Sequence, residues 1–330
     1  MRLEYPGLFD LQVNGFGGID FNAPDLTGER VAEALARLRA TGVTRCLPTL
    51  ITSSREQFAR NARVIAGAGD PMIAGIHMEG PYLSAEDGPR GAHPREHVIG
   101  ASEDDFDRRQ EAADGRIVLV TLAPEAPGTL SLIEHLVSAG VRVSIGHTAA
   151  TAGEIGDAIA AGATLATHLG NGCAQLLPRH PNAIWTLLAA DDVSASFIVD
   201  GHHLPPDTVK AMVRAKGAAR SILVTDASAA AGSPPGRYTL GGVLSELSDD
   251  GRVSLPGTPY LAGSALTLAA AVANTVRFTR LSVSSVLPMA STIPAGLIGL
   301  TTCGTVVADW DQDACSLKVL TVSGDDAVGK

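Results

Sequence analysis

Eight short runs rich in apolar residues alternate with helix-like stretches along the chain. The runs are Leu8–Val13, Thr44–Ile51, Met72–Met78, Arg116–Thr121, Val141–Ile145, Ala163–Thr167, Val193–Val199 and Ser221–Thr225. Strands that alternate with helices predict a parallel sheet, because two parallel strands need a long crossover connection. Eight such units predict closure into a (β/α)8 barrel of the TIM type, for which a chain of 330 residues is long enough. The alternative is an open doubly wound sheet, but GFGG at 15–18 leads into Ile-Asp-Phe and not into a GxGxxG fingerprint.

Helical periodicity fills most of the stretches between the runs. In the segment Glu29–Ala40, apolar residues recur at helical spacing. Thr151 and Glu154 have the spacing of a capping box, which predicts that another helix begins there. Apolar residues make up 45% of the chain and charged residues 18%, so a core of the size that a barrel needs can be buried.

The chain changes in composition after the eighth run. Residues 227–263 are rich in Gly, Ser and Pro and are expected to form a small hairpin insertion over the pocket. A helical region, 264–300, completes a barrel that spans residues 6–300. Residues 301–330 are expected to form short strands and a tail. The two strands are Thr305–Ala308 and Leu317–Val322.

Charge and cysteine content exclude several classes of function. The formal net charge is −10 and no Lys/Arg cluster is present, so neither nucleic acid nor an anionic membrane is an expected partner. The four cysteines are far apart and show no CxxC spacing, which favours a reducing cytoplasm over a disulfide framework. We find no signal peptide and no apolar run long enough to span a membrane.

Four of the runs are followed by residues that can carry chemistry, namely Glu79, His147, His168 and Asp226. In a parallel barrel the carboxyl ends of the strands share one rim, so these residues can meet in one pocket. One carboxylate and two imidazoles leave an open coordination position, as in catalytic zinc sites, and Asp226 is placed to move a proton. Each residue alone has a structural alternative, such as a hydrogen-bonded histidine, a helix-capping Glu79 or a turn at Asp226. Their joint occurrence at four strand ends favours the metal site.

Ten motifs carry a resemblance to a known family. They are PGLFDLQVNGFGG (6–18), HMEGPYL (77–83), RGAH (90–93), LAPE (122–125), GHT (146–148), THLGN (167–171), VDGHHL (199–204), LVTDA (223–227), LAGSALTL (261–268) and MASTIPAGLIGL (289–300). In this order they resemble the amidohydrolase superfamily and, within it, the N-acetylglucosamine-6-phosphate deacetylase family. The resemblance implies a hydrolase that removes the acetyl group from N-acetylglucosamine 6-phosphate.

The resemblance implies roles for individual residues. Glu79, His147 and His168 match the family's metal ligands. Asp226 matches its general base, which takes a proton from metal-activated water and gives it to the leaving amine. The catalytic His93 matches the histidine that contacts the acetyl carbonyl.

Contacts to the sugar phosphate are implied in the same way. The matching residues are Asn171 and Gly172 for the sugar phosphate, and Arg179 and His203 for its phosphate group. In the family the last of these reaches across from the neighbouring subunit, so a homodimer is expected. Unaided by the resemblance, Arg179 also suits this role, because its planar fork of donors fits a phosphate dianion.

The number of metal ions follows from two further positions. Many amidohydrolases carry His-x-His after the first strand, where this chain has Gln12 and Asn14. Neutral amides are poor ligands for a divalent transition metal, so one metal per chain is expected. Zn²⁺ is the expected ion, and Fe²⁺ also suits a Glu–His–His site.

Departures from the family pattern leave alternatives open. Gly170 stands where the family has a bulky residue and is expected to open space beside the sugar, and either His202 or His203 can be the phosphate contact. The alternatives are a deacetylase of a galactosamine epimer or of an unphosphorylated sugar, and a non-catalytic sugar-phosphate-binding homologue. The chain also begins almost at the first barrel strand, where relatives carry half of a small β-sandwich. Residues 301–330 are therefore expected to be a vestigial remnant of that domain.

Overall fold

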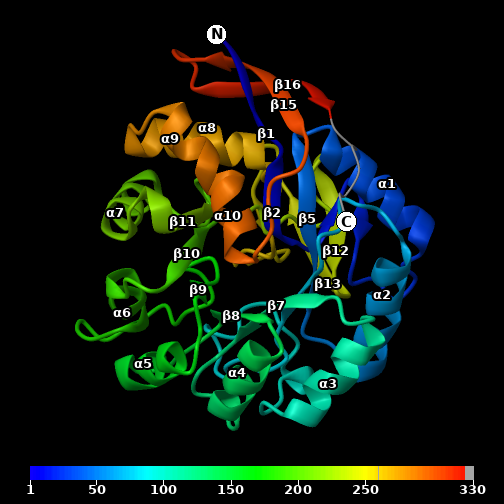
Figure 1. Ribbon diagram of the computed structural model, residues 1–330, viewed down its shortest axis with the longest axis vertical. Coiled ribbons are helices and arrows are strands. Elements are labelled where there is room, and N and C mark those ends of the chain that lie inside the picture. The colour runs from blue at the N-terminus through cyan, green and yellow to red at the C-terminus, as the bar shows by residue number, and fades with distance from the viewer. Residues whose placement is uncertain (259, 324–330) are drawn as a thin grey trace.

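The computed structural model describes residues 1–258 and 260–323 of the chain. Eight strands form one parallel sheet in the order β11-β10-β9-β8-β7-β6-β5-β2 (Figure 1). They are β2 (Leu8–Val13), β5 (Val43–Ile51), β6 (Ile76–Glu79), β7 (Ile117–Leu122), β8 (Arg142–Ile145), β9 (Leu165–Ala166), β10 (Ser194–Phe197) and β11 (Ser221–Leu223). The predicted (β/α)8 fold is confirmed, with strands that are mostly shorter than the apolar runs.

The third strand begins later than the sequence pattern predicts. Met72 and Ile73 lie in a turn, because the Asp70 carboxylate accepts the Met72 N–H at 2.8 Å and the Asp70 carbonyl accepts the Ile73 N–H at 3.0 Å. Ile73 makes only an isolated bridge to Cys46. The expectation of a strand from Met72 is therefore wrong. The strand β6 contains only Ile76–Glu79.

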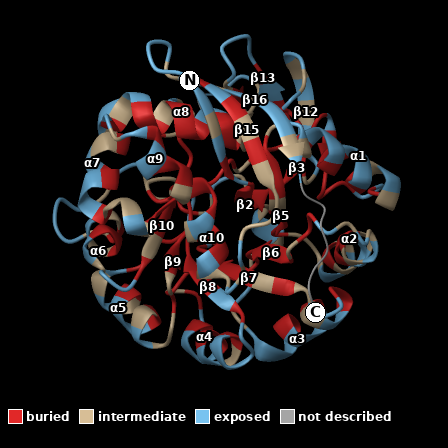
Figure 2. Ribbon diagram, turned by 45° about the horizontal axis from the view of Figure 1, so that its top comes forward, coloured by how far each residue is buried: buried red, intermediate tan, exposed pale blue. Residues whose placement is uncertain are grey.

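A helix follows each barrel strand and packs on the outside of the sheet (Figure 1). These helices are α1 (Gly28–Arg39), α2 (Arg55–Gly67), α3 (Glu103–Ala112), α4 (Thr129–Ser138), α5 (Ala152–Ala160), α6 (Ala183–Ala189), α7 (Pro206–Lys216) and α8 (Leu268–Thr279). The predicted capping box opens α5: Thr151 accepts the Glu154 N–H, and Glu154 accepts the Thr151 N–H at 2.7 Å. Buried residues gather on the strands and on the inner faces of the helices (Figure 2).

The barrel closes where the first and the last strand meet. β2 and β11 lie at the two ends of the hydrogen-bonded order. At the ends of these strands, the Asp226 N–H donates to the Gln12 carbonyl at 3.0 Å and the Asn14 N–H donates to the Ala227 carbonyl at 2.8 Å. The hydroxyl of Thr225, which follows β11, donates to the carboxylate of Asp10 in β2 at 2.6 Å. Closure therefore brings residues 12–14 next to Asp226.

Asp10 gives the fold a testable dependence on pH. Burial raises the pKa of Asp10 from 3.8 to about 7. Between these values the folded protein keeps a proton that the unfolded chain has released, so the free energy of unfolding falls as pH rises, by about 1.4 kcal/mol per pH unit. We expect this contribution to be absent from Asp10→Asn. Urea unfolding of both proteins from pH 4.5 to 8 measures it: the destabilisation of Asp10→Asn should shrink as pH rises, and parallel curves would contradict the assignment.

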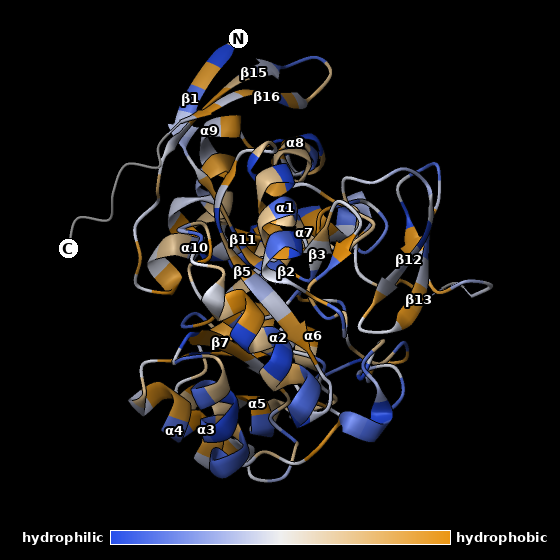
Figure 3. Cartoon of the chain, turned by 90° about the vertical axis from the view of Figure 1, so that its right-hand side faces the viewer, coloured by the Kyte–Doolittle hydropathy of each residue, from blue (hydrophilic) through white to orange (hydrophobic). Residues whose placement is uncertain are grey.

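Three small sheets surround the barrel. The insertion forms an antiparallel sheet of β12 (Gly236–Leu240), β13 (Val243–Leu247) and β14 (Val253–Ser254), which projects from the side of the barrel (Figure 3). A second sheet has the order β1-β15-β16 and joins β1 (Arg2–Pro6) to β15 (Thr305–Asp311) and β16 (Ser316–Ser323). The sequence pattern did not predict β1. β3 (Gly15–Phe16) pairs with β4 (Ile19–Asp20).

Short helices link the barrel to its last strands. They are α9 (Val283–Val286) and α10 (Thr292–Leu297), within the region expected to be helical. The predicted strands near the C-terminus correspond to β15 and β16, whereas residues 324–330 of the expected tail lie outside the described residues. The division of the chain into a barrel and a remnant domain stays a prediction. In the part of the chain that the structure describes, no helix has the length and apolar character needed to cross a bilayer.

Candidate metal centre and active site

A cavity of about 600 Å³ opens at the carboxyl ends of the barrel strands, a size typical of small-molecule sites. Most of the residues expected at the site line it. They are Glu79, His93, His147, His168, Asn171, Gly172, His203 and Asp226. The exception is Arg179, which is exposed and does not line this cavity. The structure therefore brings together every predicted site residue except one.

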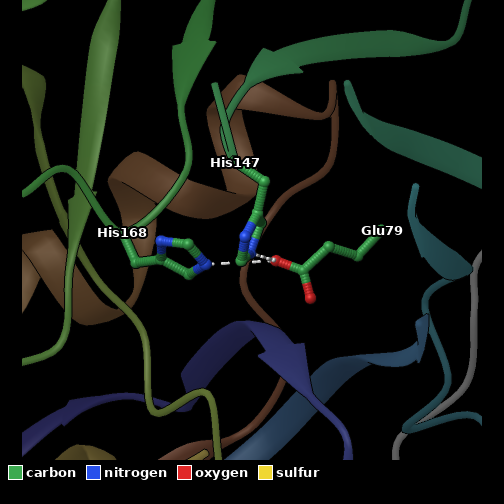
Figure 4. Close-up of side chains that lie close together, drawn as sticks. All are labelled: Glu79, His147 and His168. Carbon is green, nitrogen blue, oxygen red and sulfur yellow. Dashed lines mark hydrogen bonds and ion pairs between the residues drawn. The ribbon is translucent and has the colours of Figure 1, made fainter. Parts of the chain in front are cut away.

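Glu79, His147 and His168 form the predicted cluster (Figure 4). Glu79 Oε1 lies 3.1 Å from His168 Nε2 and 3.3 Å from His147 Nε2, and the three ligand atoms all lie within 4.8 Å of one another. The side chain of His147 is oriented by a hydrogen bond of 3.0 Å between its Nδ1 and the Pro89 carbonyl. Because that carbonyl can only accept, Nδ1 carries a proton, and Nε2 is the ring nitrogen that faces Glu79 and would give up its own proton to bind a metal. Two imidazoles and one carboxylate fit a divalent cation.

Contacts within the cluster shift the pKa values of Glu79 and His168 in opposite directions. Burial works to raise the pKa of Glu79, but hydrogen bonds from His147 and His168 outweigh it and hold this pKa well below its ordinary value. Burial works to lower the pKa of His168, and the hydrogen bond to Glu79 reverses that effect and raises it. Glu79 is therefore an anion in the pocket, as a metal ligand must be.

The backbone is strained at three of the four residues that were predicted from the strand ends. His147, His168 and Asp226 have φ angles of +50°, +30° and +51°. Residues other than glycine seldom adopt such angles, and each one costs roughly 1–3 kcal/mol that the surrounding packing must offset. Strain of this kind gathers at functional sites because it aims a side chain in a direction that a regular strand end cannot provide.

Gln12 and Asn14 contact the two carboxylates of the site. Gln12 Nε2 donates to Glu79 Oε1 at 2.8 Å, and Asn14 Nδ2 donates to Asp226 Oδ1 at 2.7 Å. Burial, and then the charge of Glu79, raise the pKa of Asp226 above its ordinary value. A carboxylate that binds its proton more readily than usual suits a group that must accept and then return one.

His93 lies beside the cluster as a neutral histidine. Burial, and then the charge of His147, lower the pKa of His93 to about 3. The Thr52 N–H donates to His93 Nδ1 at 3.4 Å, so the proton of the neutral ring is on Nε2. Nε2 faces the cluster, 3.9 Å from Glu79 Oε2. His93 can therefore donate a hydrogen bond to a substrate oxygen held next to the metal ligands.

His203 lies in the pocket of its own chain, which corrects the expectation that it reaches across from a neighbouring subunit. Its Nδ1 contacts Asp200 Oδ2 at 2.6 Å, and Asp200 also accepts the N–H groups of His202 and His203 at 2.8 Å each. His202 Nε2 instead contacts the Asp250 carbonyl in the insertion at 3.2 Å. Asp200 was missed in the sequence, although it stands in the VDGHHL motif.

Two glycines of the loop after β9 have different surroundings. At Gly172 a Cβ atom would lie 2.8 Å from His147 Nδ1, so the absence of a side chain lets the loop pack on the metal-binding ring. At Gly170, which has a φ of +96°, a Cβ atom would meet Leu204 and Met212 at 3.0 and 3.2 Å. Gly170 lines the cavity, but a side chain there would point toward α7 and the segment before it, so the expectation that Gly170 opens space beside the sugar stays a prediction.

The insertion forms one wall of the cavity, and the sequence did not indicate which of its residues do so. Leu240, at the end of β12, lines the cavity, as do Leu261, Ala262 and Gly263 further along. The hairpin between β12 and β13 is fixed to the barrel by the Gly241 N–H, which donates to Asp20 at 2.8 Å. Only the motif that begins at Leu261 gave a signal in the sequence.

Comparison with known proteins agrees with the fold. The model of the amidohydrolase family matches residues 5–321. The chain is 36% identical over 311 residues to the N-acetylglucosamine-6-phosphate deacetylase of Bos taurus, a match that covers 89% of this chain and 74% of the relative. It is 36% identical over 332 residues to the N-acetylgalactosamine-6-phosphate deacetylase of Shewanella sp. (strain ANA-3), with 95% and 80% covered.

A solved structure is similar over nearly the whole chain. It is a mutant of the N-acetyl-D-glucosamine-6-phosphate deacetylase of Mycobacterium smegmatis in complex with N-acetyl-D-glucosamine-6-phosphate, with a TM-score of 0.90, 32% identity and coverage of 98% of this chain and 86% of that chain. The chain belongs to the amidohydrolase family, in the group formed by the N-acetylglucosamine-6-phosphate deacetylases and their relatives.

Proposed function

We propose that this protein is a metal-dependent deacetylase that converts N-acetylglucosamine 6-phosphate to glucosamine 6-phosphate and acetate. The observation that carries the proposal is one pocket that holds three metal-ligand side chains, a carboxylate of raised pKa and a neutral histidine. A purely sugar-phosphate-binding homologue would not need a carboxylate beside the metal ligands. The family membership adds the substrate class.

The chain's own residues can perform the steps of amide hydrolysis. Glu79, His147 and His168 would hold one divalent ion, Zn²⁺ or Fe²⁺ by its ligand set. That ion supplies Lewis acidity and lowers the pKa of a bound water. Asp226 takes a proton from the attacking water and gives it to the departing amine. His93 Nε2–H donates to the acetyl oxygen and stabilises the negative charge that develops there.

Acetate release tests this proposal directly. Protein loaded with Zn²⁺ or Fe²⁺ should release acetate from N-acetylglucosamine 6-phosphate and should act poorly on unphosphorylated N-acetylglucosamine. N-acetylgalactosamine 6-phosphate belongs in the same assay, because a deacetylase of that epimer is as similar to this chain as one of the glucosamine sugar. A higher kcat/KM on the galactosamine epimer would replace the proposed substrate, and no release from any of the three would reject a deacetylase.

The exposed position of Arg179 supports a homodimer. Arg179 lies outside the cavity of its own chain, on a loop whose Leu176 is 92% exposed and close in sequence to Trp185, which is 56% exposed. Large apolar side chains on a surface are typical of an interface. We therefore propose that this loop faces a second copy and that Arg179 contacts the phosphate held in the partner's pocket. A reducing cytoplasm is the proposed location, since the four cysteines are far apart in the sequence and show no CxxC spacing.

Mixed dimers provide a sharp test of Arg179. Arg179→Ala alone should raise KM for the phosphorylated sugar by about 10- to 100-fold, because a hydrogen bond to a charged group is worth about 1.5–3 kcal/mol. When Arg179→Ala and Asp226→Asn chains are mixed, the Arg179→Ala chain keeps its base and receives an intact arginine from its partner. Activity at low substrate should then exceed that of either parent dimer. No gain on mixing would assign Arg179 to its own chain or to no role.

A further inference from the structure

Two amide side chains from one end of β2 each contact one carboxylate of the site. Gln12 and Asn14 are two positions apart in an extended segment, so both side chains project to the same side of the strand. Both are 1% exposed. Gln12 donates to the proposed metal ligand Glu79, and Asn14 donates to the proposed base Asp226. The proposed mechanism gives neither amide a task.

The barrel closure fixes the backbone of these amides relative to the carboxylates. The Asp226 N–H donates to the Gln12 carbonyl, and the Asn14 N–H donates to the Ala227 carbonyl. Val13, between the two amides, donates its N–H to the Thr49 hydroxyl at 3.1 Å. An amide anchored on both sides restricts the rotamer of the carboxylate that it contacts, since a side-chain hydrogen bond is strong only in a narrow geometry.

The amides also address an electrostatic problem. Glu79 and Asp226 are two buried carboxylates in one pocket, and like charges at such a site repel. Neutral N–H donors stabilise an ionised carboxylate without adding a charge of their own. The amide of Asn14 has a defined orientation, because turning it over would place its oxygen against Asp226. In this orientation Asn14 Oδ1 is buried, has no hydrogen-bond partner in the described part of the chain and belongs to a residue that lines the cavity.

We propose that Gln12 and Asn14 are positioning residues: Gln12 holds Glu79 in its metal-binding rotamer, and Asn14 holds Asp226 in its proton-transfer rotamer. Asn14 Nδ2 occupies one oxygen of Asp226 and leaves the other for the attacking water, and Asn14 Oδ1 can accept a hydrogen bond from that water. Two neutral amides thus order the two carboxylates of the pocket. The role of Asn14 rests on the proposed deacetylase function, whereas the role of Gln12 concerns metal binding alone.

Asn14→Ala tests the first half. We expect kcat to fall by about 10- to 100-fold, the range that loss of an orienting partner gives around metal sites, with KM and metal content unchanged. In an Asp226→Asn background the same substitution should have no further effect, because Asn14 acts through Asp226. Equal losses in the two backgrounds would overturn the proposal. Asn14→Ser, whose side chain is too short to reach Asp226, should give the same result should the alanine variant not fold.

Gln12→Leu tests the second half without any substrate. Competition with a chelator should show metal affinity weaker by about 10- to 100-fold, and an affinity equal to that of the wild type would overturn this role. Asn61→Ala is the matched control, since Asn61 is a buried amide that bonds the carbonyls of Phe21 and Ala23 away from the cavity. It should lower Tm but change neither kcat nor metal affinity. A wild-type protein that binds metal but releases no acetate would reject the deacetylase and leave the Gln12 result standing.

Discussion

Asp226→Asn is expected to lower kcat by about 10²–10⁴-fold, the contribution that a positioned general acid–base group makes. Asparagine has the shape of aspartate but can neither take a proton from water nor give one to the amine. The metal should stay bound, because Glu79, His147 and His168 form the cluster without Asp226. Steady-state kinetics and metal analysis of the same preparation measure both effects.

The electrostatic setting of Asp226 explains why the loss should be large. Its carboxylate is buried beside the negative Glu79, and both burial and that charge raise its pKa. A carboxylate with a raised pKa holds a proton more readily than an ordinary aspartate, which suits a group that must pass a proton from water to the amine. Asp105→Asn is a suitable control, since Asp105 is also a buried carboxylate but pairs with Arg55 and Arg109 outside the cavity. It should lower Tm and leave kcat unchanged. Near-normal turnover of Asp226→Asn would remove Asp226 from the mechanism.

The barrel was predictable because its elements depend on local patterns. The run Val141–Ile145 becomes β8, and the capping box at Thr151 and Glu154 opens α5, since both signals involve residues close together in the sequence. β1 gave no such signal. It is a five-residue strand held by β15, from the other end of the chain, so its stability comes from a pairing that a local pattern does not contain.

The residue types of the site could be predicted from the sequence, but the hydrogen bonds between its side chains could not. A Glu, two His and an Asp at strand ends could be recognised because a parallel barrel places those ends on one rim. The hydrogen bonds of Gln12 and Asn14 could not, because they join residues far apart in the sequence: Gln12 of β2 reaches Glu79 of β6, and Asn14 reaches Asp226 where the barrel closes. Sequence reasoning treated both residues as missing metal ligands, whereas the structure makes them donors to the carboxylates that remain.

The motifs could not show whether a residue serves the pocket of its own chain or that of a second copy. The resemblance paired Arg179 with His203 as phosphate contacts, but the two occupy different surroundings. His203 is held in its own pocket by Asp200, while Arg179 is exposed. Motif order along a chain carries no information on which copy of the chain a side chain serves. The mixed-dimer experiment supplies that information.

Removal of the metal is expected to lower turnover by at least about 10³-fold, because Lewis-acid stabilisation of the reacting oxygen is worth several kcal/mol. Dialysis against a chelator should give inactive protein that regains activity on addition of Zn²⁺ or Fe²⁺. His168→Ala should reproduce the loss without recovery. His135→Ala is its control. His135 of α4 pairs with the exposed Asp107 of α3, outside the cavity, so this variant should keep full activity.

The number of metal equivalents that restores activity tests the site more strictly than the fact that metal restores it. Activity should be complete at one equivalent of metal per chain, since the described residues offer one cluster of three ligands and Gln12 and Asn14 meet its carboxylates through N–H groups. An amide N–H group has no lone pair to offer a cation, so the contacts that Gln12 and Asn14 make with Glu79 and Asp226 are not those of metal ligands. A requirement for two equivalents would mean that both amides rotate to present their oxygens, and the one-metal site and the positioning role would fail together.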